Sequence, residues 1–263
     1  MVDIVLCVFS SSQLSPAETW AKEYFKEPPI VINVPGDGGA SFRANIIRWA
    51  KTGDLFRAAL KDAIAKGLKI DPNIEIRNRM FVSFSVGWSA MDELVKFPKE
   101  LERLNSYLLL DGCHTPNLDL WKKLALRAAS YNGLFMAMAN SSIKPPFVAS
   151  SVTNLSMFNY CKDELKYCTN VPLYNYEIPD LVTTKKLEKP VLVQLGAAGS
   201  PGTKTYIPSI KKTWTEDPLI SAESIGNLIN LHYAGTDRPD HVYIARETQK
   251  RLWKMMGNYF NLD

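Results

Sequence analysis

Ser89 stands in the segment "VGWSAM", between an apolar stretch and a helical pattern. A buried strand that turns into a helix within two or three residues forces the turn residue into a cramped backbone, so its neighbours must be small. Here those neighbours are Gly87 and Ala90. Such a turn lifts a serine over the carboxyl edge of a sheet, at the positive end of the following helix. The pattern predicts Ser89 as the nucleophile of an acyl-transfer reaction, and the alternative is a tight turn in which Ser89 only caps the helix.

A serine nucleophile needs a general base, because its hydroxyl is a poor nucleophile at neutral pH. The chain has 3 histidines, which are His114, His232 and His241. His241 follows the last predicted strand and precedes the last predicted helix, so we predict it as the base. The alternative is a surface histidine beside a helix cap. His232 lies inside an apolar strand pattern and is expected to be a core residue.

A third group must orient the imidazole and stabilise its charged form. Asp111 ends an apolar strand pattern, and ligands and catalytic groups collect at the carboxyl ends of strands in open α/β sheets. The next strand pattern ends at Asn140 and offers no carboxylate. We therefore predict Asp111 as the acid. The alternative is a turn-forming Asp-Gly pair, with Asp237 and Asp240 as the other candidate acids.

Acyl transfer also develops negative charge on the carbonyl oxygen, and the loss of one N–H donor to that oxygen typically costs ~100- to 1000-fold in turnover. The N–H of Ala90, directly after the predicted nucleophile, is expected to be one donor. Asp37 and Gly38 lie in "VPGDGG", between a strand pattern and a helix pattern, and are expected to supply the other. A plain glycine-rich connection is the alternative. The residues expected to line the substrate site are Gly39, Trp88 and His114.

A metal hydrolase is a further alternative, with Asp111, Cys113, His114 and a later histidine as ligands. These residues crowd one turn and lack a helix-spaced pair of ligands, so we expect no metal. We also expect no cofactor. A phosphate-binding loop is not predicted, since no Gly-Lys-Ser/Thr follows the glycine-rich segment.

Short runs rich in Val and Ile alternate with helical patterns along the chain. Strands that are apolar throughout and separated by helices are typical of a parallel sheet covered on both faces. The chain is therefore predicted to be α/β, with a three-layer α/β/α architecture and a mainly parallel sheet. Strand patterns lie at 3–10, 28–36, 80–87, 105–112, 132–140 and 226–235. Helical patterns lie at 15–27, 42–66 with a break near 52–53, 91–97, 117–130, 150–167 and 240–257.

The rhythm of strands and helices changes after Asn140. Residues 169–224 contain several prolines and tyrosines. We predict an insertion or cap over one end of the sheet, within a single domain that spans 1–263. The alternative is a long surface excursion with one edge strand at 189–196.

The formal net charge is +4, and the Lys and Arg residues are scattered. Proteins that track phosphates concentrate basic residues in one run or face, so we expect no nucleic-acid partner.

No apolar stretch approaches the ~20 residues that span a bilayer, and the N-terminus lacks the basic region of a signal peptide. We expect a cytoplasmic or otherwise soluble protein without a cleavable signal peptide. The 4 cysteines have no metal-ligand spacing, and no disulfide framework is expected.

The order of the segments "VPGDGG", "VGWSAM", "LLLDGCH" and "DRPDH" resembles the α/β-hydrolase superfamily, in its esterase-like and lipase-like branches, across most of the chain outside 144–224. The resemblance implies a predominantly parallel sheet, a triad of Ser89, Asp111 and His241, and a small-molecule or polymer-borne ester as substrate. Three departures are Met91 in place of the last glycine of G-x-S-x-G, an acid one strand early, and no obvious strand between the strand before "PGDGG" and the strand before Ser89. The segments also resemble hydrolase-like proteins of bacteria and tailed phages.

Two alternatives to an esterase stay open. An amidase or peptidase would use the same residues, and a non-catalytic binding or structural protein could be built on the same scaffold. The sequence predicts neither the oligomeric state nor the acyl and alcohol groups of the substrate.

Overall fold

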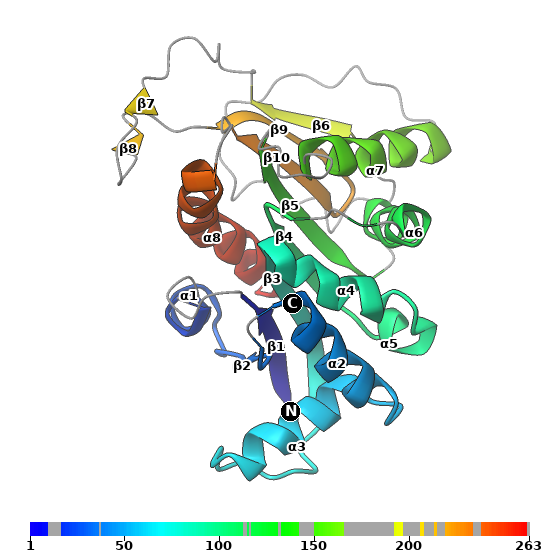
Figure 1. The fold of residues 1–263 in the computed structure, drawn as a ribbon, viewed down its shortest axis with the longest axis vertical. Helices are drawn as coiled ribbons and strands as arrows, with labels where there is room; N and C mark the ends of the chain where they lie inside the picture. The colour runs from blue at the N-terminus through cyan, green and yellow to red at the C-terminus, as the bar shows by residue number, and fades with distance from the viewer. Residues whose placement is uncertain are drawn as a thin grey trace.

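The computed structural model describes residues 1–9, 17–36, 38–112, 115, 117–130, 133–141, 150–165, 192–196, 206–207, 213–214, 219–233 and 238–261. Its centre is an eight-stranded sheet in the order β2-β1-β3-β4-β5-β10-β9-β6 (Figure 1). The strands of this sheet are β1 (Val2–Val8), β2 (Ile30–Asn33), β3 (Ile76–Phe84), β4 (Ser106–Leu110), β5 (Phe135–Ser141), β6 (Leu192–Gly196), β9 (Leu219–Ile225) and β10 (Leu228–Tyr233). A separate antiparallel pair is formed by β7 (Tyr206–Ile207) and β8 (Thr213–Trp214).

In the order of the sheet, the strands β2, β1, β3, β4, β5 and β10 pair in parallel, as predicted. The exception is β9, which is antiparallel to both β10 and β6. Gly226 and Asn227 alone join β9 to β10, and a connection of two residues can link only antiparallel strands. The sequence pattern missed β9, because it lies within the proline-rich segment that we predicted to be an insertion.

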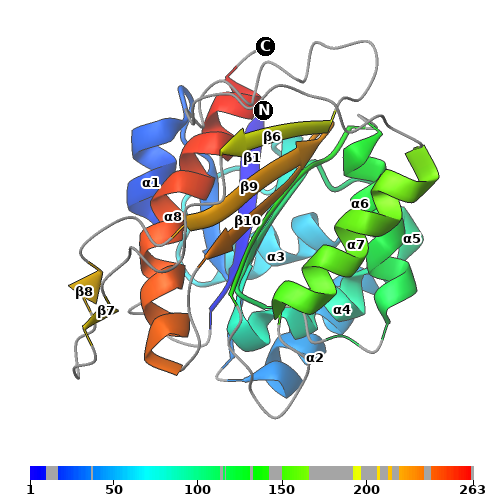
Figure 2. The ribbon, with the colours of Figure 1, turned by 90° about the horizontal axis from the view of Figure 1, so that it is seen from above.

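Helices cover both faces of the sheet (Figure 2), so the predicted three-layer α/β/α fold is confirmed. One face carries α1 (Ala17–Tyr24) and α8 (Arg238–Phe260). The other face carries α2 (Gly39–Ala50), α3 (Leu55–Ala65), α4 (Trp88–Leu94), α5 (Pro98–Glu102), α6 (Leu118–Ala129) and α7 (Ser150–Leu165).

The central strands are buried on both faces, which explains their unbroken apolar sequences. In β1, Ile4 and Leu6 pack toward α2, whereas Val5 and Cys7 pack toward α1 and α8. All four side chains are at most 1% exposed. Full burial of an aliphatic side chain contributes about 1.5–3 kcal/mol, so a polar residue on either face of β1 would be destabilising.

The predicted helix at 42–66 is divided into α2 and α3, and the break lies where the sequence placed it. Asp54 caps α3, because its carboxylate accepts a hydrogen bond of 3.1 Å from the N–H of Arg57. The short helix α5 was not predicted; it begins with Pro98, whose fixed φ suits the first turn of a helix.

Much of the predicted insertion, 169–224, lies outside the described residues. Its described parts include β6 and β9, which are strands of the main sheet and not only part of a cap. The edge strand at 189–196, which belonged to the alternative prediction, is present as β6 at the end of the sheet. The segment therefore extends the sheet by two strands beyond β10.

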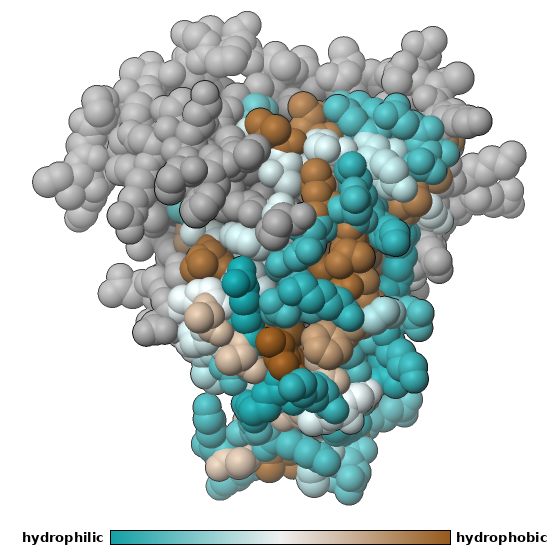
Figure 3. Space-filling view, turned by 45° about the vertical axis from the view of Figure 1, so that its right-hand side comes forward, coloured by the Kyte–Doolittle hydropathy of each residue, from teal (hydrophilic) through white to brown (hydrophobic). Residues whose placement is uncertain are grey.

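The helical face in Figure 3 is mainly hydrophilic, with apolar side chains in small separate groups. Val152 and Leu155 of α7 are among the large apolar side chains that are exposed, at 57% and 47%. Among the helices in the described part of the chain, none is both long and apolar enough to cross a bilayer.

Candidate active site

The turn from strand to helix occurs at Ser85, not at Ser89. Strand β3 ends at Phe84, a single 3-10 turn covers Ser85–Gly87, and α4 begins at Trp88. Ser85 has a φ of 51°, in the left-handed region that residues with a side chain seldom adopt. Within the described residues, Asp111 is the only other non-glycine residue with positive φ, at 37°. Backbone strain of this kind clusters at functional sites.

Gly87 allows the tight turn after Ser85. A Cβ on this residue would lie 2.4 Å from the carbonyl oxygen of Val8, so no side chain fits between the turn and β1. The segment from Ser83 to Gly87, "SFSVG", therefore matches G-x-S-x-G in a different register at the serine and at the last glycine, with Ser83 in place of the first glycine. The prediction aligned Gly87 with the first glycine of the motif, which displaced the apex by four residues.

Ser89 lies in the first turn of α4 and is only 1% exposed. Its hydroxyl donates a hydrogen bond of 3.3 Å to the carbonyl oxygen of Gly39, which begins α2. Ser89 thus joins α4 to α2. It does not stand exposed above the sheet, contrary to the prediction. Ala90, the expected oxyanion donor after it, has no exposed surface and packs into the core.

Asp111 and His241 form the pair that the sequence predicted. Asp111 follows β4 and is 2% exposed, and its Oδ2 lies 2.7 Å from Nδ1 of His241 in the first turn of α8. The backbone N–H of Ser141 donates to Oδ1 of Asp111 at 3.0 Å, and the hydroxyl of Ser141 lies 2.8 Å from Oδ2. The N–H of Asp111 donates to the carbonyl oxygen of Ala139 at 2.7 Å. The carboxylate is therefore fixed by the end of β5 on one side while it holds the imidazole on the other.

The imidazole of His241 also lies against the end of β3. Its ring centroid is 4.7 Å from that of Phe84, with 30° between the planes. Phe84 directly precedes Ser85, so the histidine lies over the strand that carries the strained serine. A Cβ built on Gly112, next to Asp111, would lie 3.0 Å from the carbonyl oxygen of Ser85. Three segments of the chain thus meet here, at Ser85, Asp111 and His241.

The glycine-rich segment after β2 reaches the same place. A Cβ on Gly39 would approach a methyl group of Val86 to 3.2 Å, so the first turn of α2 lies beside the residue after Ser85. The N–H of Gly38 points instead to Oγ of Ser41, at 3.3 Å, in a capping interaction. Gly38 is therefore engaged within α2, and the prediction for Asp37 lies outside the described residues.

Trp88 borders the site from α4. A Cβ on Gly112 would lie 3.4 Å from Cβ of Trp88, and the guanidinium of Arg43 lies 5.8 Å from the centre of the indole. This arrangement is compatible with the predicted substrate-lining role of Trp88. His114, Cys113 and Asp237 lie outside the described residues, as does the side chain of Asp240.

A buried carboxylate that the sequence analysis missed anchors the segment after Asp111. Asp92 of α4 is 3% exposed and accepts hydrogen bonds from Thr115, from Nδ2 of Asn117 at 2.9 Å and from Nε1 of Trp121 at 3.2 Å. These contacts tie the connection between β4 and α6 to α4. An aspartate one turn into a helix, five residues before Phe97, carries no signal in the sequence that would reveal this role.

The two described cysteines are not reactive thiols. Cys7 and Cys161 are free and buried, and burial raises the pKa of Cys161 to about 12. Burial raises the pKa of Cys7 still further. Neither thiol provides a nucleophile at neutral pH.

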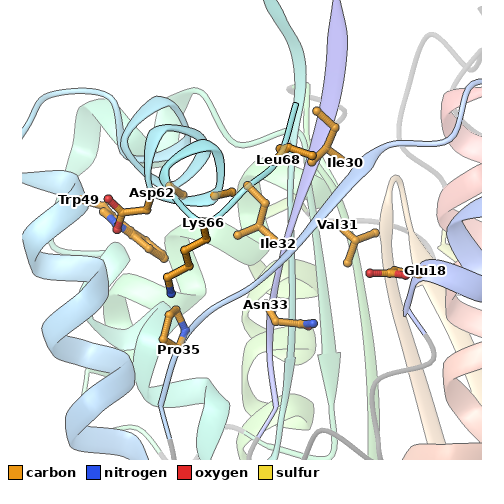
Figure 4. Close-up of a pocket in the computed structure, with 12 residues that line it drawn as sticks. Glu18, Ile30, Val31, Ile32, Asn33, Pro35, Trp49, Asp62, Lys66 and Leu68 are labelled. Carbon is orange, nitrogen blue, oxygen red and sulfur yellow. The ribbon is translucent and has the colours of Figure 1, made fainter. Parts of the chain in front are cut away.

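A cavity of about 440 Å³ lies at the β2 edge of the sheet, away from the candidate catalytic residues (Figure 4). Lys66 extends from α3 toward Pro35, and Glu18 of α1 lies near Val31 on the other side of β2. Asp62 accepts hydrogen bonds from Arg48 at 2.5 Å and from Nε1 of Trp49 at 2.8 Å, and the bond from Arg48 is the main reason that its pKa is lowered. The carboxylate of Asp62 in the wall of this cavity is thus already paired within the protein.

Within the described part of the chain, no group of three or more His, Cys, Asp or Glu side chains is arranged to hold a metal ion. The proposed metal ligands Cys113 and His114 lie outside that part, and Asp111 pairs with His241 instead. Comparisons of the chain with protein-family models, with curated proteins and with solved structures gave no match.

Proposed function

We propose that this protein is a serine hydrolase of the α/β-hydrolase type, which cleaves a carboxylic ester with Ser85 as nucleophile, His241 as base and Asp111 as acid. The observation that carries the proposal is the pair between Asp111 and His241, at 2.7 Å, whose imidazole lies over Phe84 next to the strained Ser85. The order of serine, acid and histidine along the chain is that of α/β-hydrolases.

Exposure also favours Ser85 over Ser89 as the nucleophile. Ser85 is partly exposed, whereas Ser89 is 1% exposed and its hydroxyl donates to a backbone carbonyl. A nucleophile must meet a substrate that arrives from solvent. Ser85 meets this requirement at the carboxyl edge of the sheet, where catalytic groups of open α/β sheets gather.

In the proposed reaction, Nε2 of His241 takes the proton of Ser85 as Oγ attacks the ester carbonyl carbon. Asp111 holds Nδ1 of the imidazole and stabilises its charge. The N–H of Val86, directly after the nucleophile, is the first donor to the oxyanion. The first turn of α2 at Gly39, which packs against Val86, is the source of the second.

Collapse of the tetrahedral intermediate breaks the bond from the acyl carbon to the alcohol oxygen, and His241 returns the proton to the departing alcohol. Water then attacks the acyl carbon on Ser85, with His241 again as the base. The bond from this carbon to Oγ of Ser85 breaks, His241 returns the proton to Oγ, and the carboxylate product is released. An ester is favoured over an amide, because an alcohol leaves more easily than an amine. An amidase would use the same residues, and a panel of esters and amides separates the two.

The test compares the hydrolysis of p-nitrophenyl acetate and p-nitrophenyl butyrate by wild type, Ser85→Ala and Ser89→Ala. We expect Ser85→Ala to lose at least ~10³-fold in kcat while its circular dichroism is unchanged. Ser89→Ala, the matched control four residues away, should keep activity within about tenfold, since it loses one hydrogen bond. A fluorophosphonate should label wild type on Ser85.

The opposite pattern, in which only Ser89→Ala is inactive, would move the nucleophile back to Ser89. An absence of both turnover and fluorophosphonate labelling in the wild type would reject the hydrolase proposal. It would favour a non-catalytic role for the scaffold.

A further inference from the structure

The sheet carries buried amides where an apolar core would be expected, on the face toward α7. Met136 and Met138 of β5 and Leu228 of β10 belong to the core on this face. The alternation of side chains in a strand places Asn140 and Asn230 on the same face, nearer the carboxyl edge. They are 2% and 5% exposed.

The side-chain amides of Asn140 and Asn230 are hydrogen-bonded to each other. Nδ2 of Asn140 donates to Oδ1 of Asn230 at 2.7 Å and to the carbonyl oxygen of Leu231 at 3.0 Å. His232 stands opposite Asn140 in the register between β5 and β10. The carboxyl end of this face is therefore polar, although it is covered by protein.

Asn154 of α7 differs from them. It has no exposed surface, and neither its Nδ2 nor its Oδ1 has a hydrogen-bond partner in the described structure. Met157, Phe158 and Cys161 lie three, four and seven residues further on, along the same side of the helix, and they pack into the core on this face. Asn154 therefore faces the sheet, near the end of α7 that lies toward the carboxyl ends of β5 and β10 (Figure 2).

A buried amide without partners is costly, and native proteins contain few of them. The same side chain is well suited to a ligand, since an amide offers two N–H donors and a carbonyl acceptor. A hydroxyl group, which both donates and accepts, matches it. An ion pair between Lys162 of α7 and Glu223 of β9, at 3.4 Å, already joins two opposite charges.

The amide face formed by Asn140 and Asn230 adjoins the two residues of β5 that contact Asp111. Asn140 lies between Ala139, whose carbonyl oxygen accepts from Asp111, and Ser141, which donates to Asp111. Since neighbouring side chains of a strand point to opposite faces, Asn140 points toward α7, whereas Ser141 holds Asp111. A substrate bound over Ser85 would have His241 on the α8 side and this amide face on the α7 side.

We propose that Asn154 of α7, on the same face of the sheet as the Asn140–Asn230 pair, forms a subsite for an uncharged, hydroxyl-bearing part of the substrate, and that the preferred substrates are esters of sugars or other polyols. This inference rests on the proposed hydrolase function. Asn154 forms the hydrogen bonds to the hydroxyl, and the Asn140–Asn230 pair forms the polar floor beneath it.

The test uses Asn154→Leu, which keeps the number of side-chain heavy atoms and removes the amide. The ratio of kcat/KM for methyl 6-O-acetylglucoside to kcat/KM for p-nitrophenyl acetate should fall about tenfold or more, because only the glucoside carries hydroxyls. The midpoint of thermal unfolding should stay or rise, since an unpaired buried amide is removed. The control is Asn140→Leu, which should lower the midpoint, because Asn230 and Leu231 lose their donor.

An unchanged ratio in Asn154→Leu would overturn the subsite. A fall of the midpoint as large as that of Asn140→Leu would also overturn it, since Asn154 would then be paired within the free protein. The affinity of methyl 6-O-acetylglucoside for Ser85→Ala, with and without Asn154→Leu, is measured by calorimetry. An equal affinity contradicts the subsite, whereas turnover of the ester by Ser85→Ala contradicts only the assignment of the nucleophile.

Discussion

Nδ1 of His241 lies 2.7 Å from Oδ2 of Asp111, although 130 residues separate them in the chain. The two residues meet because β4 and α8 bring their ends to the same edge of the sheet. The carboxylate is 2% exposed, and it receives hydrogen bonds from the end of β5 as well as from the imidazole. Such a carboxylate fixes the orientation of a histidine, and several predictions about the site depend on it.

Asp111→Asn should reduce kcat for p-nitrophenyl acetate by about 10²- to 10⁴-fold, because an amide does not stabilise the charged imidazole and can favour the wrong tautomer. Asparagine tolerates positive φ, so the backbone at this position is not strained further. The measurement is steady-state hydrolysis, with circular dichroism as the check of folding. Activity within threefold of wild type would exclude Asp111 as the acid and direct attention to Asp237 or Asp240.

Gly87→Ala should destabilise the protein by about 1–3 kcal/mol and reduce ester hydrolysis, since the new Cβ would lie 2.4 Å from the backbone oxygen of Val8. Gly38→Ala is the matched control, because its Cβ would have no atom within 4 Å and its backbone is extended. Urea unfolding and p-nitrophenyl acetate turnover measure the two effects. Equal stability of the two variants would contradict the close packing of the turn against β1.

His232 should make the protein less stable in mild acid. Burial lowers the pKa of this histidine below the ordinary value of 6.5, despite the opposing effect of Asp111. The folded state thus favours the neutral imidazole. Its contribution to stability is complete above pH 6.5 and is lost as the pH falls through the lower, folded-state pKa, because the unfolded chain binds the proton first.

The measurement is the free energy of unfolding by urea at pH 7.5 and pH 5.5, for wild type and His232→Gln. We expect the decrease toward pH 5.5 to be smaller in the variant, which cannot take up that proton. An identical decrease in both proteins would show that His232 is not responsible for it.

Asp92→Ala should reduce the free energy of unfolding by about 3 kcal/mol, because Thr115, Asn117 and Trp121 lose the acceptor of their hydrogen bonds. It should also reduce ester hydrolysis, since the connection that follows Asp111 loses its anchor on α4. Asp119→Ala is the control: this aspartate lies in the first turn of α6, its side chain is 93% exposed, and its loss should leave stability unchanged. The free energies of unfolding of the two variants, measured by chemical denaturation, test this prediction.

The sequence by itself was sufficient for the α/β architecture. The apolar runs of β1, β3, β4 and β5 are long, continuous and separated by helical patterns, and such a pattern has few solutions other than a covered parallel sheet. It was also sufficient to select Asp111 and His241, because a carboxylate at a strand end and a histidine before the last helix are visible in the local order of residues. It did not reveal β9, whose antiparallel direction follows from the two-residue turn at Gly226.

The tertiary structure decided which serine stands at the turn. Ser85 and Ser89 both follow an aromatic residue, Phe84 and Trp88, and precede a helical pattern, so sequence order alone cannot separate them. What distinguishes them is the contact of Gly87 with the backbone of Val8, nearly eighty residues earlier, and the position of His241 over Phe84. A strand's last residue is set by its pairing with neighbouring strands, and that pairing exists only once the sheet has assembled.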